Sequence, residues 1–357
     1  MYRRFGFFIM IVLAVMASSC GILSTDQDQV LEPIFDPPEG YYTLPVTVVL
    51  SCPTPGAEIR YNTDGTSLDT SYIIYTEPFR VEPGTTVKAA ATKLNMKRSK
   101  IVYAAYFHPA DLILSVVPGG VFNNGISNVT LSSFQCSRHE ITQGEYQAVM
   151  GTNPASGVGE GGSYPVYNVS WFDAIEYCNR RSLLEGFEPV YSYGNLGSDP
   201  SNWPAGWKDL AANQSNINCD WGRSGYRLPT EMEWEFAARG GSQSHGYTYS
   251  GSNVLDRVAW YGANAAKRSH YVGTKLGNEI GLRDMSGNVS EWLWDLFGEY
   301  PEEDQNNPTG AATGSNRVHR GGSWTPGYNL LAVHHRDSSN PTSKKDDLGF
   351  RIVRRIQ

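Results

Sequence analysis

Three helix starts, set among long connections rich in Gly, Asn and Pro, constrain the fold of this chain more than any other feature. Thr142, Ser170 and Thr230 each precede a run of helix-forming residues. Glu145 and Glu233 stand at capping-box spacing, and Asp173 stands in a first turn, where the helix dipole favours an anion. Short helices are therefore predicted over 143–150, 171–178 and 231–239. With strand-like pieces such as 128–131, they predict an α+β domain with little regular structure over residues 112–357.

Residues 33–109 carry a different pattern, in which short strand-like runs alternate with turn signals. The runs are 46–50, 58–61 and 86–91, and Pro- and Gly-containing turns separate them. This spacing predicts a small β-sandwich. Residues 56–66 (GAEIRYNTDGT) and 85–89 (TTVKA) resemble the immunoglobulin-like module at the C-terminus of chitobiases and hexosaminidases. The resemblance implies a spacer or a weak carbohydrate-associated domain.

The N-terminus has the three-part form of a secretory signal. Arg3 and Arg4 precede an apolar run over 5–16, and small residues follow up to Cys20. The cleavage site resembles a bacterial lipobox, which predicts a signal peptide over 1–19, a lipid on Cys20 and a flexible polar tether over 20–32. The alternative is an uncleaved membrane anchor, but the apolar run is shorter than the roughly 20 residues that a spanning helix needs. The expected location is the bacterial cell envelope, lipid-anchored, at the outer membrane or cell surface.

Charge and cysteine usage narrow the partners. The net charge is −7 and the basic residues are scattered, so nucleic acid, which needs a basic footprint, is not an expected partner. No cysteine pair has metal-type spacing, and the pairing of Cys52, Cys136, Cys178 and Cys219 stays open.

The C-terminal region resembles the formylglycine-generating enzyme, or sulfatase-modifying-factor, family. The family's phrases occur in order, and they are 139–142 (HEIT), 164–166 (YPV), 169–171 (VSW), 225–235 (GYRLPTEMEWE), 284–292 (DMSGNVSEW), 320–324 (RGGSW) and 348–351 (LGFR). The resemblance implies the loop-rich C-type-lectin-like fold of that family, preceded here by the immunoglobulin-like sandwich.

Several of these phrases embed charges among aromatic and aliphatic residues. Charges in such surroundings are normally paired. A buried ion-pair framework is therefore expected, rather than acid and base catalysts, from Arg227, Glu231, Glu233, Glu235, Arg320 and Arg351.

The resemblance also implies a calcium site in the turn over 284–291. By position, the side-chain ligands are Asp284 and Glu291, and the carbonyl ligands are Gly287 and Val289. A hard cation prefers such oxygen donors. The alternative is that Asp284 and Asn288 only stabilise the turn through side-chain to backbone hydrogen bonds.

At the family's reaction centre the sequence departs from the pattern. Family enzymes oxidise a substrate cysteine with two cysteines of their own, which follow the Gly-Gly-Ser-aromatic phrase and bind copper in aerobic members. Here Pro326 and Leu331 take those places. Neither can ligate a soft metal or exchange a disulfide, so whether the chain is an enzyme is open and a role without catalysis is favoured.

The segment from Trp324 to Asp347 remains as a candidate recognition surface. It is rich in aromatic rings and short polar groups, a mixture that suits adaptable recognition. The expected ligand-binding residues are Trp324, Thr325, Tyr328, Asn329, His334, His335, Asp337, Ser339 and Lys344. The arrangement resembles the variable region of retroelement-diversified surface lipoproteins, which implies binding of a protein or glycan ligand. The alternatives are a polar loop without a ligand in a structural envelope protein, and a sulfatase-modifying oxidoreductase with a divergent mechanism.

Overall fold

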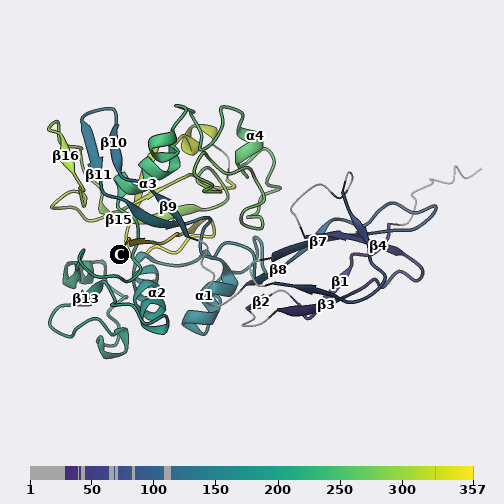
Figure 1. Ribbon diagram of the computed structural model, residues 1–357. Helices are drawn as coiled ribbons and strands as arrows, with labels where there is room; N and C mark the ends of the chain where they lie inside the picture. Colours follow the sequence, from purple (N-terminus) through teal and green to yellow (C-terminus); the bar gives the residue numbers. More distant parts are fainter. Residues whose placement is uncertain are drawn as a thin grey trace, which may run out of the picture.

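The computed structural model describes residues 29–38, 40–41, 45–63, 68, 71–82, 85–107, 114–325 and 327–356. The expected signal peptide, Cys20, most of the expected tether and Pro326 lie outside the described residues. No helix in these ranges is both long and apolar enough to span a bilayer. Figure 1 shows a β-rich N-terminal part beside a larger, loop-rich C-terminal part.

The N-terminal part consists of two sheets around one core. The first has the order β1-β3-β6 and the second the order β2-β8-β7-β4-β5, with only the β2 and β8 pair parallel. Their bounds are β1 Ile34–Asp36, β2 Gly40–Tyr41, β3 Val46–Ser51, β4 Glu58–Asn62, β5 Ile73–Ile74, β6 Phe79–Val81, β7 Thr85–Thr92 and β8 Val102–Phe107. Buried and exposed residues alternate along β3, as expected for a strand with one face on the core.

This folded part begins earlier than the predicted end of the tether at residue 32. The Val30 side chain is 2% exposed and belongs to the sandwich core. Its N–H donates to the carbonyl of Lys97 over 2.9 Å, and the Leu31 N–H donates to Thr54 Oγ1 over 2.9 Å. Val30 directly follows the polar run 24–29 (STDQDQ), and its burial fixes the end of the segment against the sandwich.

The C-terminal part is an assembly of small sheets and short helices. Its sheets have the orders β18-β17-β15-β19, β20-β12-β9, β10-β11-β16 and β13-β14. The strand bounds are β9 Leu114–Val117, β10 Gly120–Asn123, β11 Asn128–Leu131, β12 Phe134–Ser137, β13 Tyr191–Tyr193, β14 Ile217–Cys219, β15 Ser290–Leu296, β16 Gln305–Asn306, β17 Arg317–Arg320, β18 Arg336–Ser339, β19 Leu348–Gly349 and β20 Val353–Arg355. The predicted α+β class is confirmed.

The three predicted helices are present. The α-helices are α1 Gln143–Met150, α2 Trp171–Leu184, α3 Glu231–Ala238 and α4 Leu255–Val258, and the 3₁₀ turns are η1 Pro200–Asn202, η2 Ala211–Asn216, η3 Gly241–Gln243 and η4 Tyr328–Leu331. The predicted N-caps Thr142, Ser170 and Thr230 each close a reciprocal capping box. Helix α2 continues six residues beyond the predicted stretch and ends at Leu184.

The predicted ion-pair framework is also present and is almost entirely buried. Arg351 donates to both oxygens of Glu291 over 2.6 Å, and Arg227 pairs with Glu233 at 2.6 Å. Arg320 donates to Glu231 and Glu235 over 2.9 and 2.8 Å. Because a buried charge without its partner is costly, these pairs hold the loops to the sheets in one arrangement.

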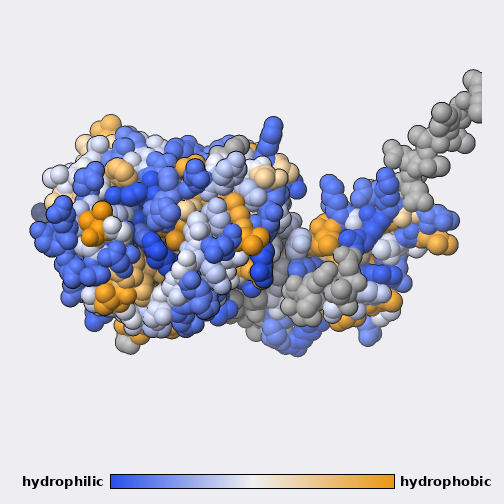
Figure 2. All heavy atoms as spheres, turned by 90° about the horizontal axis from the view of Figure 1, so that it is seen from above, coloured by the Kyte–Doolittle hydropathy of each residue, from blue (hydrophilic) through white to orange (hydrophobic). Residues whose placement is uncertain are grey.

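On the surface, apolar side chains form small separate patches on the face seen in Figure 2.

Candidate functional site

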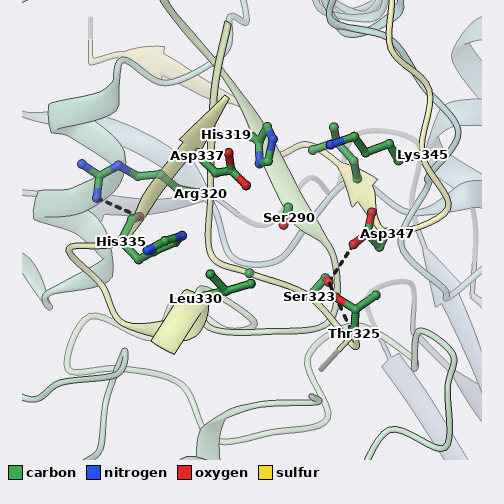
Figure 3. A pocket seen from close by; sticks show the side chains of 12 residues that line it. Ser290, His319, Arg320, Ser323, Thr325, Leu330, His335, Asp337, Lys345 and Asp347 are labelled. Atoms are coloured by element: carbon green, nitrogen blue, oxygen red, sulfur yellow. Dashed lines mark hydrogen bonds between the residues drawn. The ribbon is translucent and has the colours of Figure 1, made fainter. Parts of the chain in front are cut away.

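A small cavity lies where the RGGSW phrase leaves β17. It measures about 80 Å³ and is lined by Ser290, His319, Arg320, Gly322, Ser323, Thr325, Leu330, His335, Asp337, Lys345, Asp347 and Leu348. Figure 3 shows these side chains gathered from separate parts of the chain. The cavity has room for a few water molecules or one small polar group.

A glycine turn brings the two walls of this cavity together. Gly321 and Gly322 follow β17 with φ values of 94° and 65°, in the left-handed region that favours glycine. A Cβ on Gly322 would lie 2.8 Å from both the carbonyl oxygen of Leu330 and a methyl carbon of Leu331. The absence of a side chain at Gly322 therefore allows η4 to approach the end of β17.

Register places the histidine and the carboxylate on adjacent strands. β17 and β18 are antiparallel, with His319 opposite Asp337 and Arg320 opposite Arg336. Directly opposite residues in such a pair have side chains on the same face of the sheet. His319 and Asp337 therefore meet at the cavity although the sequence separates them.

The hydroxyl groups of the cavity are already organised by hydrogen bonds. Ser323 Oγ donates to Asp347 Oδ2 over 2.9 Å and lies 2.7 Å from Thr325 Oγ1, as the dashed lines in Figure 3 mark. Behind this row, Lys345 Nζ donates to Ser339 Oγ over 2.8 Å. The site is therefore a preorganised polar surface.

His319 is held neutral in this arrangement. Burial lowers its pKa to about 4. Its Nε2 lies 3.0 Å from Ser339 Oγ, which already accepts from Lys345. The Ser339 hydroxyl then donates to Nε2, and we assign the imidazole proton to Nδ1. With Nε2 occupied by Ser339, the Nδ1–H remains as the donor that His319 can offer to a ligand.

The family's cysteine positions hold no thiol among the described residues. Leu331 is 1% exposed and its carbonyl accepts from Ser286 Oγ over 2.8 Å, while Leu330 lines the cavity. None of the four described cysteines lines the cavity, and all four are free. Burial raises the pKa of the Cys136 and Cys219 thiols to about 12.

The structure divides the expected ligand-binding residues into four groups. Thr325, His335 and Asp337 line the cavity. Trp324 lies at its edge, with Nε1 3.4 Å from the carbonyl of Asp346, while Tyr328 and Asn329 are exposed on η4. Ser339 is buried behind His319, and Lys344 pairs with Asp173 at 2.8 Å. His334 lines a separate cavity of about 450 Å³ with Arg239, Tyr300 and Arg336.

The cavity includes Ser290, His319 and Ser323, which were not expected from the sequence, while Lys345 and Asp347 belong to the expected segment without having been singled out. The first three lie within or directly beside a family phrase. Their common signal was polar character in or next to these phrases. That signal was too general to select them before β15, β17 and β19 were placed side by side.

The expected calcium turn lies in the interior. Asp284, Gly287 and Asn288 have φ values of 59°, 85° and 63°, so the backbone turns sharply there. Asp284 Oδ2 accepts from the N–H of Gly273 over 2.5 Å, whereas Asp284 Oδ1 is buried without a hydrogen-bond partner. Glu291 is bound by Arg351 and by Trp234 Nε1 at 2.6 Å.

Three buried carboxylates lie around this turn. Glu140 joins Asp284 and Glu291, since its Oε1 accepts from the N–H of Val289 over 3.3 Å. Burial, with the charges of Asp284 and Glu291, raises the pKa of Glu140 well above its usual range. No three acidic, His or Cys side chains in the described ranges are arranged to hold a metal by themselves. Carbonyl oxygens would therefore have to supply part of the ligand set.

Comparison with known proteins agrees with both parts of the chain. Residues 110–356 match the model of the sulfatase-modifying factor enzyme 1-like domain, and residues 37–103 match that of the chitobiase/beta-hexosaminidase C-terminal domain. A Paenibacillus barcinonensis protein named chaperone protein LppX is 37% identical over 272 residues, which cover 68% of this chain and 89% of that protein.

Two further relatives bear on the site. The formylglycine-generating enzyme of Streptomyces coelicolor is 38% identical over 148 residues, covering 36% of this chain and 47% of the enzyme. The solved structure of Treponema denticola variable protein 1 has a TM-score of 0.60 and 32% identity, and covers 72% of this chain and 96% of that protein.

Proposed function

The chain belongs to the sulfatase-modifying factor family, and we propose that it is a member that binds a protein or glycan ligand through residues 324–347 without catalysis. The observation that carries the proposal is the exchange at the family's reaction centre. Buried Leu331 stands where a thiol is expected, while the adjacent cavity keeps its hydroxyls, neutral His319 and carboxylates. Such a site can hold a polar group but has no sulfur for thiol-driven oxidation.

The surroundings of the cavity support a binding surface. Tyr328 is 65% exposed on η4, and Trp324 is half-buried at the cavity edge. Rigid rings next to short hydroxyl groups provide contact area and hydrogen bonds at low entropic cost. Because β17 and β19 flank the segment and belong to one sheet, its ends are fixed in space.

The relatives indicate which ligand class to test first. The likeness to Treponema denticola variable protein 1 supports a role in display of the segment, as expected from the sequence. The name of the Paenibacillus relative, a chaperone, favours a protein over a glycan as the ligand. Both classes belong in the first experiment.

That experiment probes protein and glycan arrays with the full chain solubilised in detergent. The test variant replaces Tyr328, His334 and His335 by Ala. The matched control replaces Tyr72 and His245 by Ala, because both are exposed and lie outside the segment. We expect saturable binding that the test variant loses and the control keeps. Equal binding by all three proteins would contradict the proposal. Turnover of a sulfatase-type cysteine peptide with added copper would instead favour the oxidoreductase.

We further propose that the chain is tethered in the bacterial envelope through a lipid on Cys20. The support is the sequence pattern before Cys20, which lies outside the described residues. Metabolic labelling with a radiolabelled fatty acid should mark the natural chain and not the Cys20→Ala variant. Equal labelling of the two would exclude Cys20 as the attachment site.

Calcium is proposed as the cation at the 284–291 turn. Asp284 and Glu291 would supply side-chain oxygens, and Gly287 and Val289 would supply carbonyl oxygens. The unpartnered Asp284 Oδ1 and the surplus of buried carboxylates support this assignment. A bound cation would neutralise that surplus and fix the turn that precedes β15.

A further inference from the structure

Arg317, the first residue of β17, is a buried arginine with no described carboxylate within ion-pair distance. Arg317 is 4% exposed, and its guanidinium makes no ion pair with any described residue. Its Cζ lies 3.9 Å from the ring centre of Trp171 and 5.0 Å from that of Trp294. Nε donates to Gln214 Oε1 over 2.8 Å, and Nη1 donates to the carbonyl of Trp294.

This environment differs from that of the other buried arginines. Arg227, Arg320 and Arg351 each contact a carboxylate at 2.6 to 2.9 Å. Burial lowers the pKa of Arg317 to about 10, which still leaves the group charged at neutral pH. A buried charge without an ion-pair partner is costly, so a bound counter-charge would stabilise Arg317 in this position.

The charge of the neighbouring acid, Asp295, raises the pKa of Arg317, but Asp295 makes no ion pair with its guanidinium. Trp294 and Leu296 line a cavity with Arg317, whereas Asp295 lines a different one, as expected because successive side chains of a strand alternate. Asp295 Oδ2 accepts instead from the N–H of Glu231 over 2.9 Å. Burial raises the pKa of Asp295 well above its usual range and so favours its neutral form.

The Arg317 cavity measures about 710 Å³. Among the described residues that line it, Arg317 alone is charged, and the others are small, hydroxyl-bearing, amide or apolar. These others are Ala211, Ala212, Gln214, Ser215, Ile217, Trp294, Leu296, Thr309, Ala311, Ala312, Thr313, Gly314, Ser315 and Asn340. Nη2 of Arg317 has no hydrogen-bond partner among the described residues, so its donors remain for a ligand.

We propose that this cavity binds the carboxylate of a small hydroxylated acid, of the uronic-acid class, through the guanidinium of Arg317. The carboxylate supplies the counter-charge, and the threonine, serine and amide groups of the lining meet the hydroxyls. The rings of Trp171 and Trp294, whose centres lie 3.9 and 5.0 Å from Cζ, hold the planar fork in place.

The site is separate from the cavity at the RGGSW phrase. Arg317 begins β17 and Arg320 ends it, and the two cavities share no lining residue. Asn340 is the one lining residue that lies within 324–347. A failure of this proposal therefore leaves the proposed ligand segment untouched, and the reverse also holds.

Calorimetric titration of the full chain with glucuronate and with glucose tests the proposal. We expect saturable binding of glucuronate, no comparable binding of glucose, and a loss of at least about tenfold in affinity for Arg317→Met. Arg80→Met, an exposed arginine of the N-terminal sandwich, is the matched control and should bind normally. Trp171 and Trp294 offer a second readout, because binding beside them should change tryptophan fluorescence.

A cavity-filling variant guards against misfolding of the arginine variant. Ala212→Phe places a ring in the cavity without changing Arg317, and should reduce glucuronate binding while leaving cooperative unfolding intact. The proposal is wrong if the natural chain shows no saturable glucuronate binding, if glucose binds as tightly, or if a folded Arg317→Met chain binds unchanged.

Discussion

Lys344 Nζ lies 2.8 Å from Asp173 Oδ2, and this ion pair ties the segment between β18 and β19 to the first turn of α2. Asp173 also accepts from the N–H of Ser170 over 2.9 Å, and Lys208 Nζ lies 2.8 Å from its Oδ1. Lys344 was expected to face a ligand. The structure gives it an anchoring contact, which fixes the far end of the proposed recognition segment.

Asp173 should make stability depend on pH in the acid range. Burial opposes ionisation, but Lys208, Lys344 and Ser170 outweigh it and lower the pKa to about 2 from 3.8. A carboxyl whose pKa is lower in the folded state stabilises the fold at pH values above its unfolded-state pKa. This stabilisation is lost as the pH falls through the folded-state pKa. Asp173→Asn should cost about 2 kcal/mol at pH 7 and roughly half of that at pH 3. Urea unfolding at both pH values measures this.

The control for this prediction is Lys344→Ala. Its ammonium is largely exposed, with 55% of the side chain accessible, so its loss should cost at most about 1 kcal/mol. A cost for Asp173→Asn that is identical at pH 3 and pH 7 would show that the ionised carboxylate is not the stabilising form.

Arg320→Met should be the more damaging type of change, because its fully buried guanidinium bridges two interior carboxylates. Glu231 would keep only Arg336 and Glu235 only Arg239, and both of these arginines are partly exposed. Glu231 and Glu235 are 2% and 1% exposed, and Arg320 bonds to both. Removing one partner of a buried pair costs about 3–5 kcal/mol. Arg336→Met, whose side chain is 20% exposed, should cost less because Arg320 still pairs with Glu231. Denaturant midpoints measure both, and a loss below about 1 kcal/mol for Arg320→Met would contradict the framework role.

Local chemistry made the helices and the framework predictable. Thr142, Ser170 and Thr230 act within three residues of their partners, so a short pattern carries the information. The ion pairs follow from a general cost, since a charge placed among aromatic residues needs a partner. The sequence did not say which carboxylate each arginine would choose.

The cavity was only partly predictable because it depends on register. His319 faces Asp337 through the pairing of β17 with β18, and Ser323 reaches Asp347 across a glycine turn. The same register turns Ser339 inward, whereas His334, which precedes β18, lines another cavity. A one-residue shift in pairing would reverse these faces, and composition alone does not fix it.

Calcium should raise the thermal stability of the natural chain, and a chelator should reverse the effect. A ligand that binds only the folded state stabilises it by about 2.7 kcal/mol at one hundred times its dissociation constant. Asp284→Asn should abolish most of the shift, whereas Asp256→Asn, an exposed control, should retain it. Thermal melts with calcium and with chelator decide this. The calcium site would be excluded if calcium did not shift the melting temperature of the natural chain, or if Asp284→Asn kept the full shift. The turn would then be a hydrogen-bonded loop without a bound cation.

Gly322→Ala should damage the RGGSW cavity more than a change of backbone preference can explain. Gly322 has φ 65°, and an added Cβ would meet the carbonyl oxygen of Leu330 at 2.8 Å, which is backbone and cannot rotate away. Gly125 is the matched control, with φ 96° and no atom within 4 Å of an added Cβ. The left-handed conformation alone costs an alanine about 1–2 kcal/mol, so Gly125→Ala should lose roughly that amount of stability.

Gly322→Ala should lose more stability than Gly125→Ala, because η4 must also move away from the end of β17. The same displacement separates Leu330 from Ser323 and should weaken binding of any ligand found on the arrays, which Gly125→Ala should leave unchanged. Equal losses of stability in the two variants would mean that η4 yields easily, and the cavity would then not be the preorganised site that its hydrogen bonds indicate.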